Sequence, residues 1–379
     1  MHPLIRNLYA PLLALVFMIL GSGLLNTIVA VRLELAQFST ATIGTVTSAL
    51  YVGILLGSIW LGRWIEKVGH IRSFIAFAFV AAVMVLAQAL WIHPVYWSAL
   101  RLICGICTAG VFIVVESWLL IQSPPSQRGV VLSLYLGVFY AALSGGQFLI
   151  NLSDPESIYP FCIAGLLFGC SVVPLYFQKV SEPKIKDAVH LNISQLFRLS
   201  PLGFLGGVIS GMLLAVIYGL VPIYAKKIGL GISEIGTLMG IIIFGGLSFQ
   251  WPIGRWADKT NRRRVLNTAS FMTTVFGIAI ALLGSSPWLL LILGWFFGGF
   301  SFTIYPLSMA YVCEKVPEDQ IVSATGGFVL SYGIGAISGP LIAPFAMHLL
   351  GTGGLFYFIA LITLFLCFFG LRRPVDIAE

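Results

Sequence analysis

The chain alternates long apolar stretches with short polar connections along all of its 379 residues. An α-helix rises about 1.5 Å per residue, so roughly 20 apolar residues cross the ~30 Å hydrocarbon core of a bilayer. Twelve stretches are long enough: residues 8–33, 40–62, 72–92, 96–121, 129–150, 157–178, 201–225, 233–256, 265–285, 288–312, 321–350 and 354–371. The pattern predicts an all-α membrane protein with twelve transmembrane helices.

Composition agrees with this prediction. Hydrophobic residues make up 59% of the chain and charged residues only 9%, whereas soluble domains are about 45–50% apolar and about 25% charged. The connections between apolar stretches are short and rich in turn residues, as in SPPSQRG and NLSDPES. The longest polar stretch, residues 178–200, lies in the middle of the chain.

The net charge of +7 is explained by membrane topology. With a cytoplasmic N-terminus, 17 of the 21 Lys and Arg residues fall on the cytoplasmic side of the twelve spans. Of the other four, Arg101 lies within a span, and Arg32, Lys226 and Lys227 lie at the outer ends of spans. Cytoplasmic loops of membrane proteins carry an excess of Lys and Arg. We therefore expect both termini and the central polar stretch in the cytoplasm, and no nucleic-acid partner.

Two charged segments, GRWIEKVGHIR at 62–72 and GRWADKTNRRR at 254–264, follow one pattern 192 positions apart. At that offset residues 42–72 align with 234–264 without a gap, and 10 of the 31 positions are identical. Six predicted spans separate the copies, and an even number of spans preserves their direction. The repeat predicts two parallel six-helix bundles, residues 1–178 and 201–379, joined by a cytoplasmic linker over 179–200. Secondary transporters are built this way, with the solute site between the halves.

Both charged segments fit G-x-x-x-[DE]-[RK]-x-G-x-x-[RK], except that Asn261 replaces the second Gly in the second copy. The pattern resembles the signature loop of the major facilitator superfamily, in which Glu66 stands for the usual Asp and His70 for the usual Arg. Arg101 with Gly105 resembles the span-4 pattern of that superfamily. VVES, YGLVPIY, QWPIGRWADK and FTIYPLSMAYVCEKV resemble the YcaD-type bacterial subgroup. The resemblance implies a multi-pass transporter of the bacterial inner membrane and names no cargo. The Gly-Pro pair typical of span 5 in antiporter members is missing here.

The repeated segments are candidates for a cytoplasmic latch. Gly62 and Gly69 would give backbone freedom for a sharp turn. The carboxylate of Glu66 or Asp258 could accept hydrogen bonds from a helix start in the other half, and pair with a cation four residues on. The alternative is that these charged residues only flank a turn and fix the ends of the spans at the cytoplasmic membrane surface. The candidate gate residues are Gly62, Glu66, Gly69, His70, Arg72, Gly254, Asp258 and Arg262.

Glu116 is the acidic residue that lies well inside an apolar run, VFIVVESWLLI. An ionisable group in a span costs at least about 2.5–3.5 kcal/mol against lipid. Glu116 is therefore a candidate for proton coupling. The alternatives are an ion pair with His70 or Arg72 and a plain helix-packing hydrogen bond. Fifteen helical residues span about 22 Å, so Glu116 cannot reach Arg101.

Other polar and aromatic residues within the spans are candidates for a solute cavity. Arg101 shares one face of its helix with Phe112 and Glu116, although it could instead extend to the outer headgroups. Ser22 and Asn26 share a face of span 1. For each tyrosine candidate the alternative is a packing role, which is the more common one for a single Tyr in a span. The candidates are Ser22, Asn26, Arg101, Phe112, Tyr140, Gln147, Tyr218, Tyr305 and Tyr332.

These observations predict a secondary transporter of a small organic solute that works by alternating access. Proton-coupled uptake is favoured over a proton-driven efflux antiporter, since span 5 has no proline. A membrane-embedded lipid-modifying enzyme is a remote alternative, because the five His residues are scattered. No nucleotide-binding loop, cofactor or metal site is expected, and Cys104 with Cys107 forms a lone CxxC. The expected partners are the solute, protons and the bilayer, and we expect a monomer.

Overall fold

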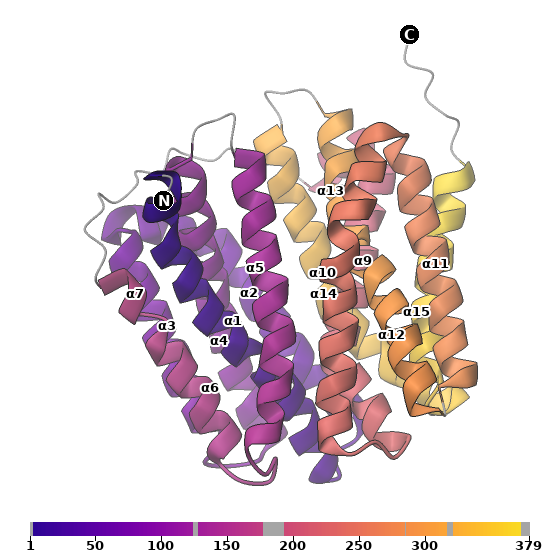
Figure 1. The fold of residues 1–379 in the computed structure, drawn as a ribbon, viewed down its shortest axis with the longest axis horizontal. Coiled ribbons are helices and arrows are strands. Elements are labelled where there is room, and N and C mark those ends of the chain that lie inside the picture. The colour runs from indigo at the N-terminus through magenta and orange to yellow at the C-terminus, as the bar shows by residue number, and fades with distance from the viewer. Residues whose placement is uncertain (1–2, 124–127, 177–192, 285, 317–320, 373–379) are drawn as a thin grey trace. The chain divides into compact units, whose positions relative to one another are not determined.

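The structure, a computed structural model, describes residues 3–123, 128–176, 193–284, 286–316 and 321–372. Within these residues every regular element is helical (Figure 1). The first half contains α1 (Pro3–Leu35), α2 (Thr40–Val68), α3 (His70–Gln88), α4 (Pro94–Ile121), α5 (Arg128–Phe148), the 3-10 helix η2 (Leu149–Leu152), α6 (Tyr159–Cys170) and α7 (Val173–Tyr176). The second half contains α8 (Ile193–Leu199), α9 (Pro201–Lys227), α10 (Ile232–Lys259), α11 (Arg262–Leu283), α12 (Pro287–Ser301), α13 (Ile304–Lys315), α14 (Ile321–Leu350) and α15 (Gly354–Arg372).

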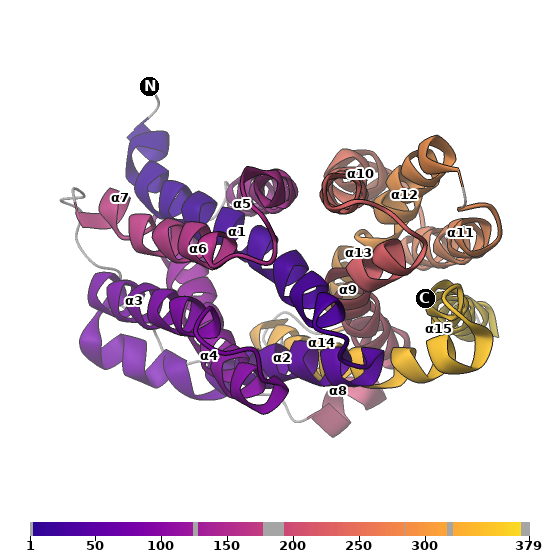
Figure 2. The same cartoon turned by 90° about the horizontal axis from the view of Figure 1, so that it is seen from below.

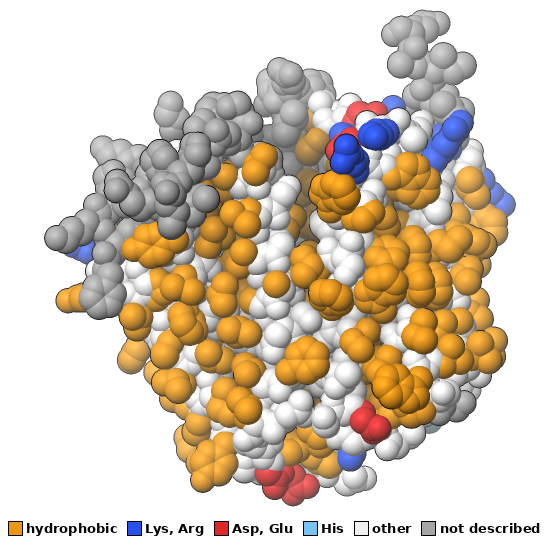
Figure 3. All heavy atoms as spheres, viewed as in Figure 1, with side chains coloured by type: hydrophobic (Ala, Val, Ile, Leu, Met, Phe, Trp, Pro, Cys, Tyr) orange, Lys and Arg blue, Asp and Glu red, His pale blue; other side chains and the backbone are white. Residues whose placement is uncertain are grey.

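Twelve segments of the described chain are long and apolar enough to cross a membrane, which confirms the predicted fold class. Hydrophobic side chains cover the flanks of the helices, and charged side chains gather near the helix ends (Figure 3). Span 6 combines α6 and α7, and span 10 combines α12 and α13. Of the predicted linker, residues 179–192 lie outside the described residues, and α8 occupies Ile193–Leu199.

Proline explains both interrupted spans. Pro306 lacks the N–H that would bond to the carbonyl of Phe302, and the helix breaks at Phe302 and Thr303. Pro174 stands in the same relation to Cys170, where α6 ends. Discontinuous helices in transporters often mark the solute site. The break in span 10 is therefore a place to look for one.

The chain divides into two compact units. Unit 1 contains residues 1–187 and 230–240, and unit 2 contains residues 188–229 and 241–379. In unit 1, α2 packs along α4, and α1 packs on α5 and α6. In unit 2, α9 packs against α13, α14 and α15, while α11 packs on α15 (Figure 2). Each unit buries an apolar core between helices far apart in sequence.

Glycines allow a close helix crossing in each unit. Gly53 of α2 meets Gly105 of α4, where an added Cβ on Gly105 would overlap the carbonyl oxygen of Leu50. The same arrangement occurs between α10 and α12, where a Cβ on Gly298 would overlap the carbonyl oxygen of Ile242. Gly245 stands 192 positions after Gly53, and Gly298 stands 193 after Gly105. The sequence repeat is thus also a repeat of helix packing.

Candidate solute-binding and coupling site

The first charged segment contains a one-residue turn. α2 continues to Val68 and α3 begins at His70, so Gly69 alone reverses the chain, with φ 94° and ψ 158°. That backbone conformation is open essentially to glycine. The expected turn role of Gly62 is wrong, because Gly62 lies inside α2, and Gly254 likewise lies inside α10. The charged ends of both helices simply continue past the apolar stretch.

The second charged segment turns without a glycine. α10 ends at Lys259 and α11 begins at Arg262, so two residues share the reversal. Asn261 has an ordinary φ of −73°, and its side chain accepts a hydrogen bond from the backbone N–H of Arg263. An N-cap therefore takes the place of the glycine found in the first copy.

The first copy lacks the expected pairing of Glu66 with His70. His70 is 1% exposed, and its Nε2 lies 3.0 Å from the hydroxyl of Ser117 on α4. Its ring also meets Trp118 edge-on at 6.2 Å. Glu66 and Arg72 are exposed on α2 and α3. Because the imidazole turns into the apolar packing between α3 and α4, it is directed away from the exposed carboxylate.

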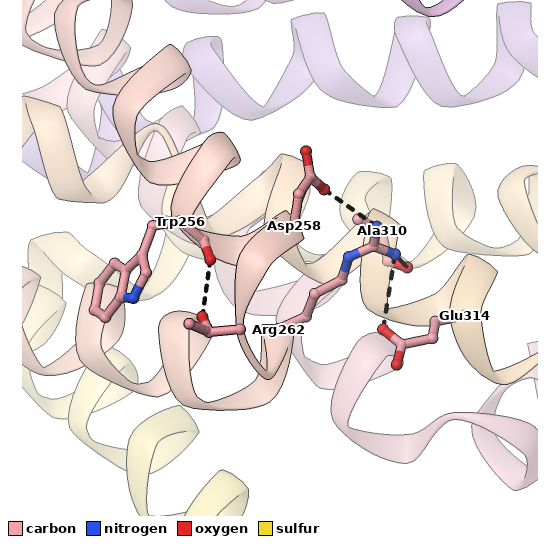
Figure 4. Close-up of polar contacts among 6 residues, drawn as sticks. Trp256, Asp258, Arg262, Ala310 and Glu314 are labelled. Carbon is pink, nitrogen blue, oxygen red and sulfur yellow. Dashed lines mark hydrogen bonds and ion pairs between the residues drawn. The ribbon is translucent and has the colours of Figure 1, made fainter.

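The second copy does form the expected pair. Nη2 of Arg262 lies 3.3 Å from Oδ1 of Asp258, and Nη1 lies 3.7 Å from Oε2 of Glu314 (Figure 4). The guanidinium also donates to the carbonyl oxygen of Ala310 at 3.3 Å. Arg262 thus connects α10, α11 and α13. These groups are accessible, since the side chains of Asp258 and Arg262 are 71% and 30% exposed.

The contact of His70 with Ser117 and the contact of Arg262 with Ala310, here called the two tethers, occupy equivalent positions in the repeat. Arg262 stands 192 positions after His70, and its acceptor Ala310 stands 193 after Ser117. Each residue joins the helix after the turn to the span that follows it, α3 to α4 and α11 to α13. The repeat therefore preserves the tether while its chemistry changes from imidazole–hydroxyl to guanidinium–carbonyl.

Glu116 lies on α4 with an uncharged partner. The hydroxyl of Tyr135 on α5 donates to Oε1 of Glu116 at 2.9 Å. The carboxyl group is exposed, and among the described residues it forms no ion pair. The alternative expectation, an ion pair with His70 or Arg72, is therefore wrong. One turn away, Phe112 meets Phe139 of α5 with ring centroids 5.8 Å apart.

Arg101 is held inside unit 1. It is 3% exposed, and its Nη2 donates to Oδ1 of Asn26 on α1 at 2.7 Å. Its Nε is enclosed without an acceptor. The alternative expectation that Arg101 extends to the outer headgroups is therefore wrong. Tyr51 on α2, 7% exposed, and Cys104 are the titratable groups that interact electrostatically with the guanidinium.

Gln147 joins α5 to α1, and both ends of its amide group are hydrogen-bonded within the protein. Its Oε1 accepts a hydrogen bond from Thr27 at 2.5 Å, and its Nε2 donates to the carbonyl oxygen of Gly23 at 3.0 Å. The side chain is 1% exposed. Ser22 donates to the carbonyl oxygen of Met18 in its own helix. Among the residues of α1 and α5 singled out from the sequence, Asn26 differs because it is partly exposed and bound to a cation.

Tyr140 and the three tyrosines of unit 2 lie in different surroundings. Tyr140 is 6% exposed and packs edge-on against Phe139. The other three are only partly buried and gather near the break in span 10. Their ring contacts are Tyr218 with Phe302 at 5.8 Å, and Tyr305 with both Tyr332 and Phe328 at 5.2 Å.

Sequence reasoning missed three members of these clusters: Thr27, Tyr135 and Phe302. Pro306 was the available signal for Phe302, since it predicts a helix break four residues earlier. Thr27 and Tyr135 carried no such signal, because their roles depend on partners 120 and 19 positions away.

The Major Facilitator Superfamily family model matches residues 12–231 and again residues 203–378. The chain belongs to the major facilitator superfamily. The two matches cover both halves of the repeat. Membership identifies a multi-pass membrane transporter and removes the lipid-modifying enzyme from consideration.

Relatives and solved structures agree with this assignment. The chain is 33% identical over 350 residues to the uncharacterised MFS-type transporter YcaD of Escherichia fergusonii, covering 91% of this chain and 90% of the relative. The Salmonella heidelberg YcaD is 32% identical over 353 residues, covering 92% and 91%. The crystal structure of the nucleoside transporter NupG matches with TM-score 0.79, 16% identity and coverage of 97% and 99%. The D-xylose–proton symporter matches with TM-score 0.79, 14% identity and coverage of 98% of both chains.

Proposed function

We propose that this protein takes up a small organic solute across the bacterial inner membrane by alternating access, coupled to the entry of protons. The observation that carries the coupling is Glu116, a carboxyl group within α4 whose partner among the described residues is the neutral hydroxyl of Tyr135. One structural neighbour is described as a D-xylose–proton symporter, which is compatible with this coupling. Asn26 and Arg101, both in unit 1, are the proposed contacts of the solute.

The proposed proton step follows from the surroundings of Glu116. The apolar surroundings of a membrane span disfavour the charged form of a carboxyl group, and a neighbouring cation would favour it. Glu116 has the neutral Tyr135 in place of a cation. The proton binds to the Glu116 carboxylate when the group faces the outer medium and leaves to water when it faces the cytoplasm. Alternating access supplies that change of exposure.

An efflux antiporter is the second candidate within the superfamily. Members of that kind carry a Gly-Pro pair in span 5, and α5 (Arg128–Phe148) contains no proline. Uptake is therefore the better proposal. We further propose that the protein is a monomer. Its two six-helix bundles would comprise residues 1–178 and 201–379, joined by a linker over 179–200, and both termini would lie in the cytoplasm.

The test uses purified protein in liposomes and a solute found by a thermal-shift ligand screen. Glu116→Gln is expected to abolish uphill accumulation driven by a pH gradient while leaving solute binding and downhill exchange intact, because the amide mimics the protonated carboxyl. Tyr135→Phe is the matched control: it keeps the carboxyl group and removes its hydrogen bond, so coupling should persist with a shifted pH profile. Full proton-driven accumulation by Glu116→Gln would refute the coupling role. Loss of binding by that variant would instead make Glu116 a solute contact.

A further inference from the structure

Arg101 is a buried cation that has no counter-charge among the described residues. Of its five N–H donors, one bonds to Asn26 and no other has a hydrogen-bond acceptor among the described residues. The groups that interact with it electrostatically are a phenol and a thiol, Tyr51 and Cys104. Glu116 lies about 22 Å farther along the same helix. Enclosing an unpaired guanidinium is unfavourable, so this position favours an anion that comes from outside the protein.

Asn26 points its donors away from Arg101. A guanidinium only donates, so the oxygen of the Asn26 amide must be the atom that faces it. The amide nitrogen, with its two N–H groups, is then directed to the other side. Asn26 is partly exposed, and its Nδ2 has no hydrogen-bond acceptor among the described residues. Arg101 and Asn26 together offer donors and a positive charge, which suits an oxyanion and disfavours a cation.

The charge at this position selects one kind of anion. One guanidinium balances a single negative charge, so a monocarboxylate is matched and a phosphate dianion is left with excess charge. Guanidinium–carboxylate contacts are also among the stronger hydrogen bonds in proteins. We infer that Arg101 and Asn26 form the binding site for the carboxylate group of the transported solute, a small organic monocarboxylate. The inference rests on the proposed transport function and names its substrate class.

With this site, the charges of the two transported ligands cancel. The carboxylate brings one negative charge to Arg101, and one proton on Glu116 brings one positive charge. The solute anion and the proton cross together, so the loaded carrier moves no net charge. The two ligands are bound about 22 Å apart on one helix, α4, which both sites share.

The test compares carboxylates with neutral amides of the same shape. Purified protein at neutral pH and constant ionic strength is titrated with acetate, lactate and benzoate, and with acetamide, lactamide and benzamide, while thermal unfolding is followed. At least one acid should raise the unfolding temperature of the wild type, and its amide should bind about 10- to 100-fold more weakly. Arg101→Gln and Asn26→Leu should each lose the response to the acid by about the same factor.

Two further measurements separate binding from folding. Ligand-free Arg101→Gln should unfold no earlier than the wild type, because it removes an uncompensated buried charge; an arginine with a purely structural role would give a less stable variant. Arg32→Gln is the matched control, since Arg32 at the end of α1 donates to the carbonyl oxygen of Pro155 and should leave the response intact.

Three results would overturn the inference: no response of the wild type to any of the acids at millimolar concentration, equal responses to acids and amides, or an undiminished response of folded Arg101→Gln. The outcome is independent of proton coupling, because binding in detergent needs no gradient. Proton-driven transport of a neutral solute would leave the proposed function standing and remove this inference. Arg101-dependent carboxylate binding without proton movement would do the reverse.

Discussion

Gly105→Ala tests whether the glycine crossing between α2 and α4 sets the helix spacing in unit 1. The added Cβ would overlap the carbonyl oxygen of Leu50 and lie 2.9 Å from the backbone nitrogen of Ile54 and 3.0 Å from Cα of Gly53. Carbon atoms normally approach to about 3.5–4.0 Å. All three neighbours are backbone atoms, so no side-chain rotation can relieve the overlap. The two helices must therefore move apart along their most extensive contact.

The cost follows from two opposing terms. Overpacking a well-packed core costs about 1–3 kcal/mol, and alanine gains about 1 kcal/mol over glycine in a helix interior. With backbone atoms on every side the upper end of the range applies, which leaves about 2 kcal/mol of net destabilisation. Gly137→Ala is the matched control: Gly137 lies inside α5 with no atom within 4 Å of its ideal Cβ. That variant should be stabilised by up to about 1 kcal/mol.

The assay is thermal unfolding of fluorescent-protein fusions in detergent, followed by size-exclusion chromatography of the folded fraction. Gly105→Ala should unfold earlier than the wild type, and Gly137→Ala at the same temperature or later. Equal stability of the two variants would refute the reasoning that Gly105 is required for close approach. The proposed solute-binding residues Arg101 and Asn26 lie on α4 and α1, so a displacement of α4 away from α2 should also affect binding.

Two other predictions concern the cytoplasmic side. Asp258→Ala should raise the inward-facing population, as measured by spin-label distances across the cytoplasmic mouth. The loss of stability should be small, because an exposed ion pair contributes only about 0–1 kcal/mol. Glu314→Ala is the control: it removes the other carboxylate near Arg262 and should leave those distances unchanged. A cysteine introduced at position 190 should be labelled only by reagents that reach the cytoplasm, and labelling from outside the cell would contradict the proposed orientation.

The spans and their repeat could be predicted because the bilayer imposes a length and an apolar composition on every crossing segment. The ends of the helices could not. Gly62 looked like the start of a turn since it follows the last apolar residues of its stretch, yet α2 continues to Val68. Charged residues are well solvated at the ends of spans. The change from apolar to charged positions therefore marks the limit of the hydrocarbon and does not determine where the helix ends.

The site residues show where sequence reasoning stops. Asn26 and Gln147 are both amides within apolar spans, and nothing local distinguishes them. The structure gives Gln147 two protein partners in α1, whereas Asn26 is oriented by Arg101, 75 positions away. Whether a polar group serves the fold or remains open to a solute depends on contacts between helices. Local sequence cannot supply that information.

The repeat itself indicates which half carries the ionic chemistry. The helix crossings and the tethers at His70 and Arg262 recur at offsets of 192 and 193. At those offsets Arg101 and Glu116 correspond to uncharged residues: Leu293 or Gly294, and Ser308 or Met309. The break in span 10 is surrounded instead by aromatic rings. Duplication has thus preserved the scaffold in both units, while a cation and an acid remain on one helix of unit 1. If both bind their ligands as proposed, the charge balance of transport is set within α4.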